Sequence, residues 1–345
     1  MGGFIVAPRL GAAMETRKVQ VTGGSTYTVS LPKDWATANG VEAGSTVAFY
    51  PEDDVLVLSP TRADERVEGT LDVTTLEGDE LVRAVMTMYV SGFDVIALEA
   101  DRITTDQRRS IREATQSLVG LEVLEETADR VVIQDLLDSA ELSIHNAITR
   151  MRLIATSMLQ DAVTALAEND DDLAMDVVER DDDVDRLWYM VSRVFRTVLR
   201  NPAEATEIGF PRETVFDYQS SARQLERIAD HATKIAGIAL NIGPVNDSVA
   251  AALRELQEAA LTVPETAMDA LLADDADEAV ELAQEARSDL PDIDERARDV
   301  DDVIRSLDEP ELAQSLGLVV DSLSRTADYG GNIAESALQK AAPSP

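Results

Sequence analysis

The size and composition of this chain limit what it can be. Its 345 residues are 45% hydrophobic but only 4% aromatic, which is enough apolar material for two or three domains packed mainly through alanine and leucine. It contains no cysteine, so disulfides and thiolate metal sites are excluded.

The charge of the chain is extreme and evenly spread. The formal net charge is -36, and nearly all of the positive charge is arginine, because the only lysines are Lys18, Lys33, Lys234 and Lys340. Such a sequence resembles proteins of salt-loving archaea, in which concentrated salt screens the self-repulsion of an acidic surface. The alternative is an acidic binding protein, in which we expect the acidic residues to be confined to a tail.

No targeting or membrane segment is evident in the sequence. We expect no helix that spans a membrane, because the chain has no run of about 18 apolar residues. Residues 1–13 lack the basic start of a signal peptide, and we expect an unstructured leader there, with Met14 as a candidate natural start. These features favour a cytoplasmic protein.

Residues 14–60 predict a small all-β unit. Two alternating stretches, Lys18–Thr22 and Thr26–Leu31, flank a Gly-Gly-Ser turn, and a helical turn begins at Pro32. Two further strands follow. The unit resembles the swapped-hairpin AbrB/SpoVT family through three short motifs: Ser30-Leu31-Pro32-Lys33, Gly40-Val41 and Gly44-Ser45-Thr46-Val47.

The AbrB/SpoVT resemblance implies a dimer that exchanges hairpins. We therefore expect a homodimer, since so short a unit buries little surface alone. The resemblance also implies DNA contact through basic residues near the first hairpin, here Arg17, Lys18 and Lys33. DNA affinity comes largely from neutralising phosphates, and the many acidic neighbours oppose it, so dimerisation without DNA binding is the alternative.

Residues 66–136 predict a small α/β domain after a polar linker. The expected order is strand, helix, strand, helix and a final hairpin: Thr70–Thr74, Gly78–Ser91, Phe93–Glu99, Thr105–Leu118, Leu121–Glu125 and Arg130–Gln134. No glycine-rich phosphate loop follows these strands, which argues against a nucleotide site.

From Leu137 onward the pattern predicts helices only. Six long amphipathic segments follow: Leu137–Glu168, Asp171–Arg200, Arg212–Ile242, Asp247–Ala273, Asp277–Leu307 and Glu311–Lys340. Pro264 and Pro291 should kink or interrupt the fourth and fifth segments. The segments form tandem three-helix bundles over residues 137–243 and 246–341, so the expected fold is multidomain: all-β, then α/β, then all-α.

An internal repeat supports two bundles. The stretch around Leu225-Glu226-Arg227-Ile228-Ala229-Asp230-His231 returns as Leu323-Ser324-Arg325-Thr326-Ala327-Asp328-Tyr329, at a constant offset of 98 residues. Glu226 and Asp230 are four residues apart, so their carboxylates share one helix face. In the second copy Ser324 replaces the glutamate.

These motifs resemble the signature of PhoU, the phosphate uptake regulator, over about Leu137–Leu338. The companion motif in the second helix is Glu179-Arg180-Asp181-Asp182-Asp183-Val184-Asp185. PhoU-type proteins are tandem three-helix bundles with acidic motifs that hold metal ions in some members. The resemblance implies metal ligands at Asp181, Asp185, Glu226 and Asp230.

Carboxylate oxygens also suit a divalent metal or iron by their own chemistry. Adjacent antiparallel helices should bring the two acidic pairs together, and His231 could add a nitrogen. The alternative is a solvated acidic face answered by arginines. In the second bundle Ala286 and Leu290 align with Asp181 and Asp185, which leaves Asp328 nearly alone and makes a second equivalent site doubtful.

We expect no catalytic residues, because no nucleophile motif, Walker loop or Glu-x-x-His pair occurs. The PhoU resemblance implies control of phosphate uptake through contact with the ATPase of a phosphate transporter or with a signalling protein. One alternative is a transcription regulator whose AbrB-like dimer binds DNA, and a second is a metalloenzyme.

Overall fold

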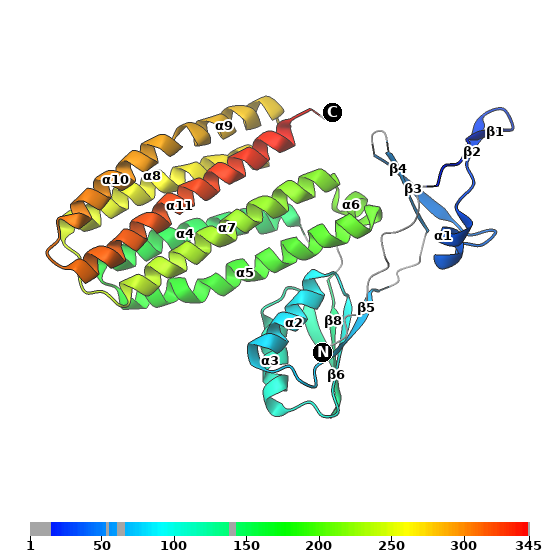
Figure 1. Cartoon of the computed structure of the whole chain (residues 1–345), viewed down its shortest axis with the longest axis horizontal. Coiled ribbons are helices and arrows are strands. Elements are labelled where there is room, and N and C mark those ends of the chain that lie inside the picture. The colour runs from blue at the N-terminus through cyan, green and yellow to red at the C-terminus, as the bar shows by residue number, and fades with distance from the viewer. Residues whose placement is uncertain (1–14, 53–54, 61–65, 138–142, 344–345) are drawn as a thin grey trace. The chain divides into compact units, whose positions relative to one another are not determined.

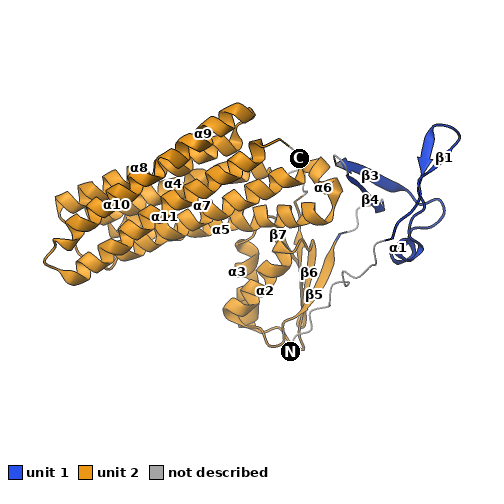
Figure 2. Cartoon of the chain, turned by 45° about the horizontal axis from the view of Figure 1, so that its top comes forward, with its two compact units in different colours: residues 1–66 blue, residues 67–345 orange. Residues whose placement is uncertain are grey.

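The computed structural model describes residues 15–52, 55–60, 66–137 and 143–343. The chain divides into two compact units, Met1–Arg66 and Val67–Pro345 (Figure 2). The expected leader over residues 1–13 lies outside the described residues. No helix in the described part of the chain is long and apolar enough to cross a membrane.

The first unit is built from two hairpins and one short helix. Strands β1 (Gln20–Thr22) and β2 (Thr26–Thr28) pair antiparallel, and Gly23 and Gly24 between them adopt positive φ angles of 63° and 82°. The remaining elements are α1 (Lys33–Ala38), β3 (Val47–Glu52) and β4 (Val55–Pro60), of which β3 and β4 form the second hairpin. The predicted all-β unit is confirmed.

The first unit has no core of its own. None of its described residues is buried, and Val21 and Tyr27 of the first hairpin are 61% and 78% exposed. Val55 and Leu56 of the second hairpin are equally open. The apolar side chains of both hairpins are therefore open to contact, with no buried residue beneath them in the described part of the unit.

The α/β domain opens the second unit. Its elements are β5 (Glu68–Asp72), α2 (Gly78–Val90), β6 (Val95–Glu99), α3 (Thr105–Gln116), β7 (Leu121–Glu126) and β8 (Arg130–Asp135). The sheet order is β5-β6-β8-β7, with β5 parallel to β6 and the other pairs antiparallel. Ile96, Leu98 and Ile133 belong to the core of this domain, together with residues of α2 and α3. The predicted α/β domain is confirmed.

The helical region contains two three-helix groups (Figure 1). The first group is α4 (Ile144–Glu168), α5 (Asp171–Arg200) and α7 (Arg212–Ala239), with a short α6 (Pro202–Ile208) between α5 and α7. The second is α8 (Asp247–Leu272), the pair α9 (Ala276–Ser288) and α10 (Leu290–Arg305), and α11 (Pro310–Ala341). We call these groups bundle 1 and bundle 2. The predicted tandem bundles are confirmed.

Two details differ from the predicted helices. The first helix begins at Ile144, after an N-cap at Ser143, and Leu137 is not helical because its N–H bonds the Asp135 carboxylate. The break after Arg200 holds the extra helix α6, since Asn201 caps its start and Pro202 occupies its first turn. Both features depend on local capping that helical periodicity does not reveal.

The two prolines behave differently. Pro291 falls in the first turn of α10, so the fifth segment is divided into α9 and α10. Pro264 instead lies inside a continuous α8. Gly330 of α11 packs against it so closely that a Cβ on Gly330 would lie 2.5 Å from the Pro264 nitrogen. The absence of a side chain on α11 thus lets the two helices meet at the proline.

The internal repeat brings equivalent residues face to face. His231 of α7 and Tyr329 of α11 occupy the same repeat position, and their rings lie 5.6 Å apart. The His231 Nε2 and Tyr329 hydroxyl are 3.3 Å apart. The helices α7 and α11, which carry the two copies of the repeat, therefore contact each other at equivalent positions.

Candidate metal site

The acidic motifs of bundle 1 meet where α5 packs against α7. Asp181 and Asp185 lie one helical turn apart on α5, and Glu226 and Asp230 lie one turn apart on α7. Burial raises the pKa of Asp181, and the charges of Asp230 and Asp182 raise it further. Because carboxylates on one helix shift the pKa values of those on the other, the structure brings the four predicted residues into one cluster.

Two members of this acidic cluster are strongly perturbed. Burial, followed by the charges of Asp181 and Asp230, raises the pKa of Asp185 to about 6. Burial and the charge of Asp230 raise the pKa of Glu226 to about 7, although the Arg223 guanidinium opposes the shift. Both effects disfavour negative charge, so the cluster is suited to taking up positive charge.

Glu226 is the most enclosed of the four carboxylates. Its side chain is only 11% exposed, and Oε1 accepts a hydrogen bond of 2.7 Å from Nη1 of Arg223. Its second oxygen, Oε2, is buried without a hydrogen-bond partner in the described part of the chain. A buried acceptor left unpaired costs about 1 to 3 kcal/mol, so a cation or proton at Oε2 would relieve it.

The donor set fits a hard divalent cation, but the side chains are not arranged as a finished site. Among the described residues, no three His, Asp or Glu side chains lie as ligands of one metal ion. Hard cations take six or more oxygens at short, well-defined distances. Metal binding at the acidic cluster therefore requires rotation of the carboxylates toward a common centre.

His231, considered in the sequence as a possible metal ligand, contacts bundle 2 in the structure. Its Nε2 faces the Tyr329 hydroxyl of α11, and its Nδ1 is buried without a described partner. Burial lowers the pKa of His231, and the charge of Lys234 lowers it further, which favours the neutral ring. The residue thus lies at the junction of the two bundles.

Bundle 2 lacks the acidic cluster. Asp328 is 55% exposed and pairs with Arg325 at 3.3 Å. The buried residues Ala297, Val300 and Ile304 of α10 repeat the spacing of Val191, Val194 and Val198 in α5. Aligning the two helices by these buried residues shifts the sequence alignment by one residue. The position equivalent to Asp185 is then Pro291 instead of Leu290. In either alignment no carboxylate stands opposite Asp185.

The basic residues predicted for DNA contact lie on the surface of the first unit. Arg17 pairs with the neighbouring Glu15, which offsets its charge. Lys18 precedes β1, Lys33 begins α1, and both are exposed. Only the two lysines therefore present uncompensated positive charge near the first hairpin, among the described residues of the predicted set.

A buried arginine that sequence reasoning missed joins bundle 1 to the α/β domain. Arg193 of α5 is 7% exposed and pairs with Asp94 at 2.7 Å and Asp135 at 3.0 Å. It also donates hydrogen bonds to the carbonyls of Tyr89 and Phe93, at 2.8 and 2.9 Å. The sequence held one indication of this role, because Arg193 is the only charged residue in the stretch from Met190 to Val194.

Tyr189 links the acidic cluster to this interface. It lies one turn from both Asp185 and Arg193 on α5, and its ring packs against the core of the α/β domain. Burial raises the pKa of Tyr189, and the charges of Asp185 and Glu226 raise it further. The α/β domain therefore contacts the helix that carries half of the cluster.

Comparison with known proteins agrees with this arrangement. Residues 148–239 match the family model of the PhoU domain, and residues 20–66 match that of MazE, the antidote-toxin recognition domain of a bacterial antitoxin. No curated protein matches the chain.

Two crystal structures are similar to the chain. PhoU from Pseudomonas aeruginosa is 22% identical over 58% of this chain and 96% of its own, with a TM-score of 0.47. The phosphate transport system regulatory protein PhoU from Streptococcus pneumoniae is 20% identical over 56% of this chain and 91% of its own, with a TM-score of 0.44. Bundle 1, with its acidic cluster, thus lies in a stretch that matches the PhoU domain, and the first unit in one that matches MazE.

Proposed function

We propose that this protein regulates phosphate uptake by binding to other proteins. The observation that carries the proposal is the match of residues 148–239 to the PhoU domain, within which lie all four residues of the acidic cluster. Neither matched family model describes a catalytic domain. The partner is the ATPase of a phosphate transporter or a phosphate-signalling protein, and the site of action is the cytoplasm.

The test is phosphate uptake in the source cells after deletion of the gene. We expect uptake from phosphate-rich medium to rise in the deletion strain and to return to normal when the intact gene is restored. Labelled phosphate accumulation measures this directly. Normal uptake in the deletion strain would contradict the proposal.

The acidic cluster serves in this proposal as a site for a divalent metal or iron. Asp181, Asp185, Glu226 and Asp230 would hold the ion, which would neutralise the cluster and join α5 to α7. Elemental analysis and thermal melting test this without any assay of activity. We expect Mn²⁺ or Mg²⁺ to raise the Tm of the intact protein, whereas the double variant Glu226→Gln, Asp230→Asn should bind less metal and show no rise.

The matched control for the metal site is Asp328→Asn, which changes the repeat-equivalent residue of bundle 2. Its metal content and Tm shift should equal those of the unchanged protein. Equal metal content in the double variant and the unchanged protein would remove the acidic cluster as the site.

We also propose that the first unit forms a homodimer. Its exposed strand residues, such as Val21 and Tyr27, would complete a core against the same unit of a second copy. Sedimentation should give a dimer, and Tyr27→Asp, Val21→Asp should give a monomer. A monomeric unchanged protein would end this part of the proposal.

A second candidate function is DNA-binding transcription control. The MazE match and the exposed Lys18 and Lys33 favour it. Sequence-selective retardation of promoter DNA, lost on changing Arg17, Lys18 and Lys33 to alanine, would support it. Retardation that does not depend on these residues or on sequence would reject it.

We further propose that the protein works in concentrated salt. A formal net charge of -36 destabilises a compact state through self-repulsion, which salt screens. The Tm should therefore rise steadily from about 0.1 M to about 2 M KCl, a range in which the Debye length falls from about 10 Å to below about 3 Å. A Tm that does not depend on salt would contradict this proposal.

A further inference from the structure

One face of α5 in bundle 1 is covered by the α/β domain. Arg193 inserts into the domain as described above, and Tyr189 packs against its core. Thr197, one turn further along, lies against the turn at Gly92, where a Cβ would come within 3.2 Å of its hydroxyl. Tyr189, Arg193 and Thr197 thus form a stripe that binds a folded partner within the same chain.

The equivalent stripe of bundle 2 lies on α10. The shared spacing of buried residues aligns Val191, Val194 and Val198 with Ala297, Val300 and Ile304. In that register the stripe residues Tyr189, Arg193 and Thr197 correspond to Glu295, Asp299 and Val303. No described element of the chain covers the α10 stripe, whose three residues are all exposed.

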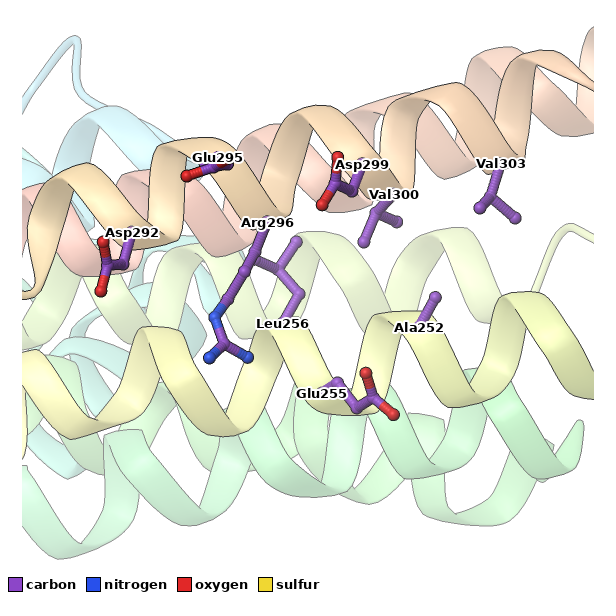
Figure 3. Close-up of a pocket in the computed structure, with 9 residues that line it drawn as sticks. All are labelled: Ala252, Glu255, Leu256, Asp292, Glu295, Arg296, Asp299, Val300 and Val303. Atoms are coloured by element: carbon purple, nitrogen blue, oxygen red, sulfur yellow. The ribbon is translucent and has the colours of Figure 1, made fainter.

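The α10 stripe borders a groove of about 540 Å³ between α8 and α10 (Figure 3). Figure 3 shows Arg296, Val300 and Val303 of α10 projecting toward α8. The side chains of Leu256 and Val300 are buried and form the apolar floor. From Asp292 to Val303 the groove runs along three turns of α10, or about 16 Å.

The walls of the groove carry unpaired charge. Four carboxylates line it, from Glu255, Asp292, Glu295 and Asp299, against the single guanidinium of Arg296. None of these five side chains forms a hydrogen bond or ion pair with another described residue. The charge is reversed from bundle 1, since Asp299 stands where Arg193 reaches the acids of the α/β domain.

We propose that this groove binds a basic amphipathic helix of a partner protein. Its apolar side chains would contact Ala252 and Val303 above the buried floor, and its lysines or arginines would pair with Glu295 and Asp299. A helix laid into an apolar groove is a common mode of peptide recognition, and acidic walls select basic sequences. The inference rests on the proposed function only in taking the partner to be a protein.

Two synthetic peptides, each about 16 residues long, test the groove. They share one leucine face, and their polar positions are lysine and arginine in the first peptide and glutamate and glutamine in the second. Fluorescence anisotropy with the full-length protein, in salt that keeps it folded, should give a Kd of about 10 µM for the basic peptide and no binding for the acidic one.

Variants locate the binding. Glu295→Gln with Asp299→Asn should weaken the basic peptide about tenfold, or about 1.4 kcal/mol, and Val303→Gln should weaken it several-fold without a change of charge. The matched control, Asp294→Asn with Asp301→Asn, removes the same charge from the other flank of α10 and should change the affinity less than about twofold. Circular dichroism confirms that each variant is folded.

Two outcomes would contradict the proposal that this groove binds a basic helix. One is failure of the basic peptide to bind at all, and the other is equal weakening by both double variants, which would reveal general attraction to an acidic surface. Phosphate uptake in cells tests the proposed function and peptide binding in solution tests the groove, so either can fail alone.

Discussion

Bundles 1 and 2 share a helix plan but differ in what their second helices carry. In bundle 1 that helix is the unbroken α5, which holds Asp181 and Asp185 on one side and the buried Arg193 on another. In bundle 2 it is divided at Pro291, has no carboxylate opposite Asp185, and leaves its outer stripe uncovered. The difference shows that two copies of a helical bundle can keep the same packing while the exposed faces of their second helices carry different residues.

The largest effect should come from removing Arg193, whose equivalent position in bundle 2 is Asp299. Arg193→Met leaves Asp135 buried and unpaired, so we expect a loss of about 3 to 5 kcal/mol in the free energy of unfolding. Urea unfolding followed by circular dichroism measures it. The matched control is Arg298→Met on α10, where the guanidinium donates to the Asp294 carbonyl of its own helix and has no other partner among the described residues.

The control should change the free energy of unfolding by less than about 0.5 kcal/mol. Equal losses in Arg193→Met and Arg298→Met would mean that the α/β domain is not held by Arg193. The comparison between the two second helices would then fail.

The next effect concerns the pH dependence that the acidic cluster gives to bundle 1. The pKa of Glu226 is raised from 4.5 to about 7, so the folded state binds more protons than the unfolded state between these values. The contribution of Glu226 to stability should therefore be full below pH 4.5 and be lost as the pH rises through about 7, by about 3 kcal/mol at most.

Glu226→Gln removes the part of this pH dependence that Glu226 contributes, while the raised pKa of Asp185 still contributes its own part. At pH 8 and with a chelator present, the variant should be more stable than the unchanged protein by about 1 to 3 kcal/mol. Asp328→Asn in bundle 2 should change stability by less than about 0.5 kcal/mol, because Asp328 is exposed. A Glu226→Gln profile parallel to the original one would show that Glu226 is not the group that titrates.

A smaller effect tests the close packing of α11 against α8 in bundle 2. Gly330→Ala places a Cβ 2.5 Å from the Pro264 nitrogen and 2.8 Å from Val263 Cγ1. Because backbone must move to admit it, we expect a loss of about 1 to 2 kcal/mol, measured by thermal melting. No change in Tm would mean that α8 and α11 separate easily at the proline.

The smallest effect should have the opposite sign and lies in bundle 1. Gly237 of α7 is helical, and a Cβ there would meet no atom within 4 Å. Gly237→Ala should therefore stabilise the protein by about 0.5 to 1 kcal/mol through the lower entropy of the unfolded chain. A loss of stability would point to a tighter approach at α7 than the structure has.

The sequence predicted those parts of the molecule that depend on local pattern. Helical periodicity located the main helices, alternation located the strands of the first unit, and the repeat of 98 residues predicted two bundles. Pro291 predicted the break between α9 and α10, because proline suits the first turn of a helix and not its interior, whereas Pro264 does not interrupt α8. The four carboxylates were chosen because the acidic motifs resemble those of PhoU and because residues four apart share a helix face, and the structure brings them close together.

The parts that were missed depend on residues far apart in the chain. Arg193 is about 100 residues from Asp94 in the chain. Helical and strand periodicity relate only neighbouring residues, so they could not predict this ion pair. His231 was considered as a metal ligand because it follows Asp230. In the structure its Nε2 instead faces the hydroxyl of Tyr329, which is 98 residues away in the chain. The groove between α8 and α10 depends on how far one helix stands from another, which a single sequence does not encode.

The contact between His231 and Tyr329 shows what fusion of two repeats permits. In a dimer of identical subunits, a residue on the symmetry axis meets its own copy, so any substitution there changes both sides at once. Joining the copies in one chain removes that constraint. Each of the two residues can then vary alone, so that an imidazole from one repeat contacts a phenol from the other.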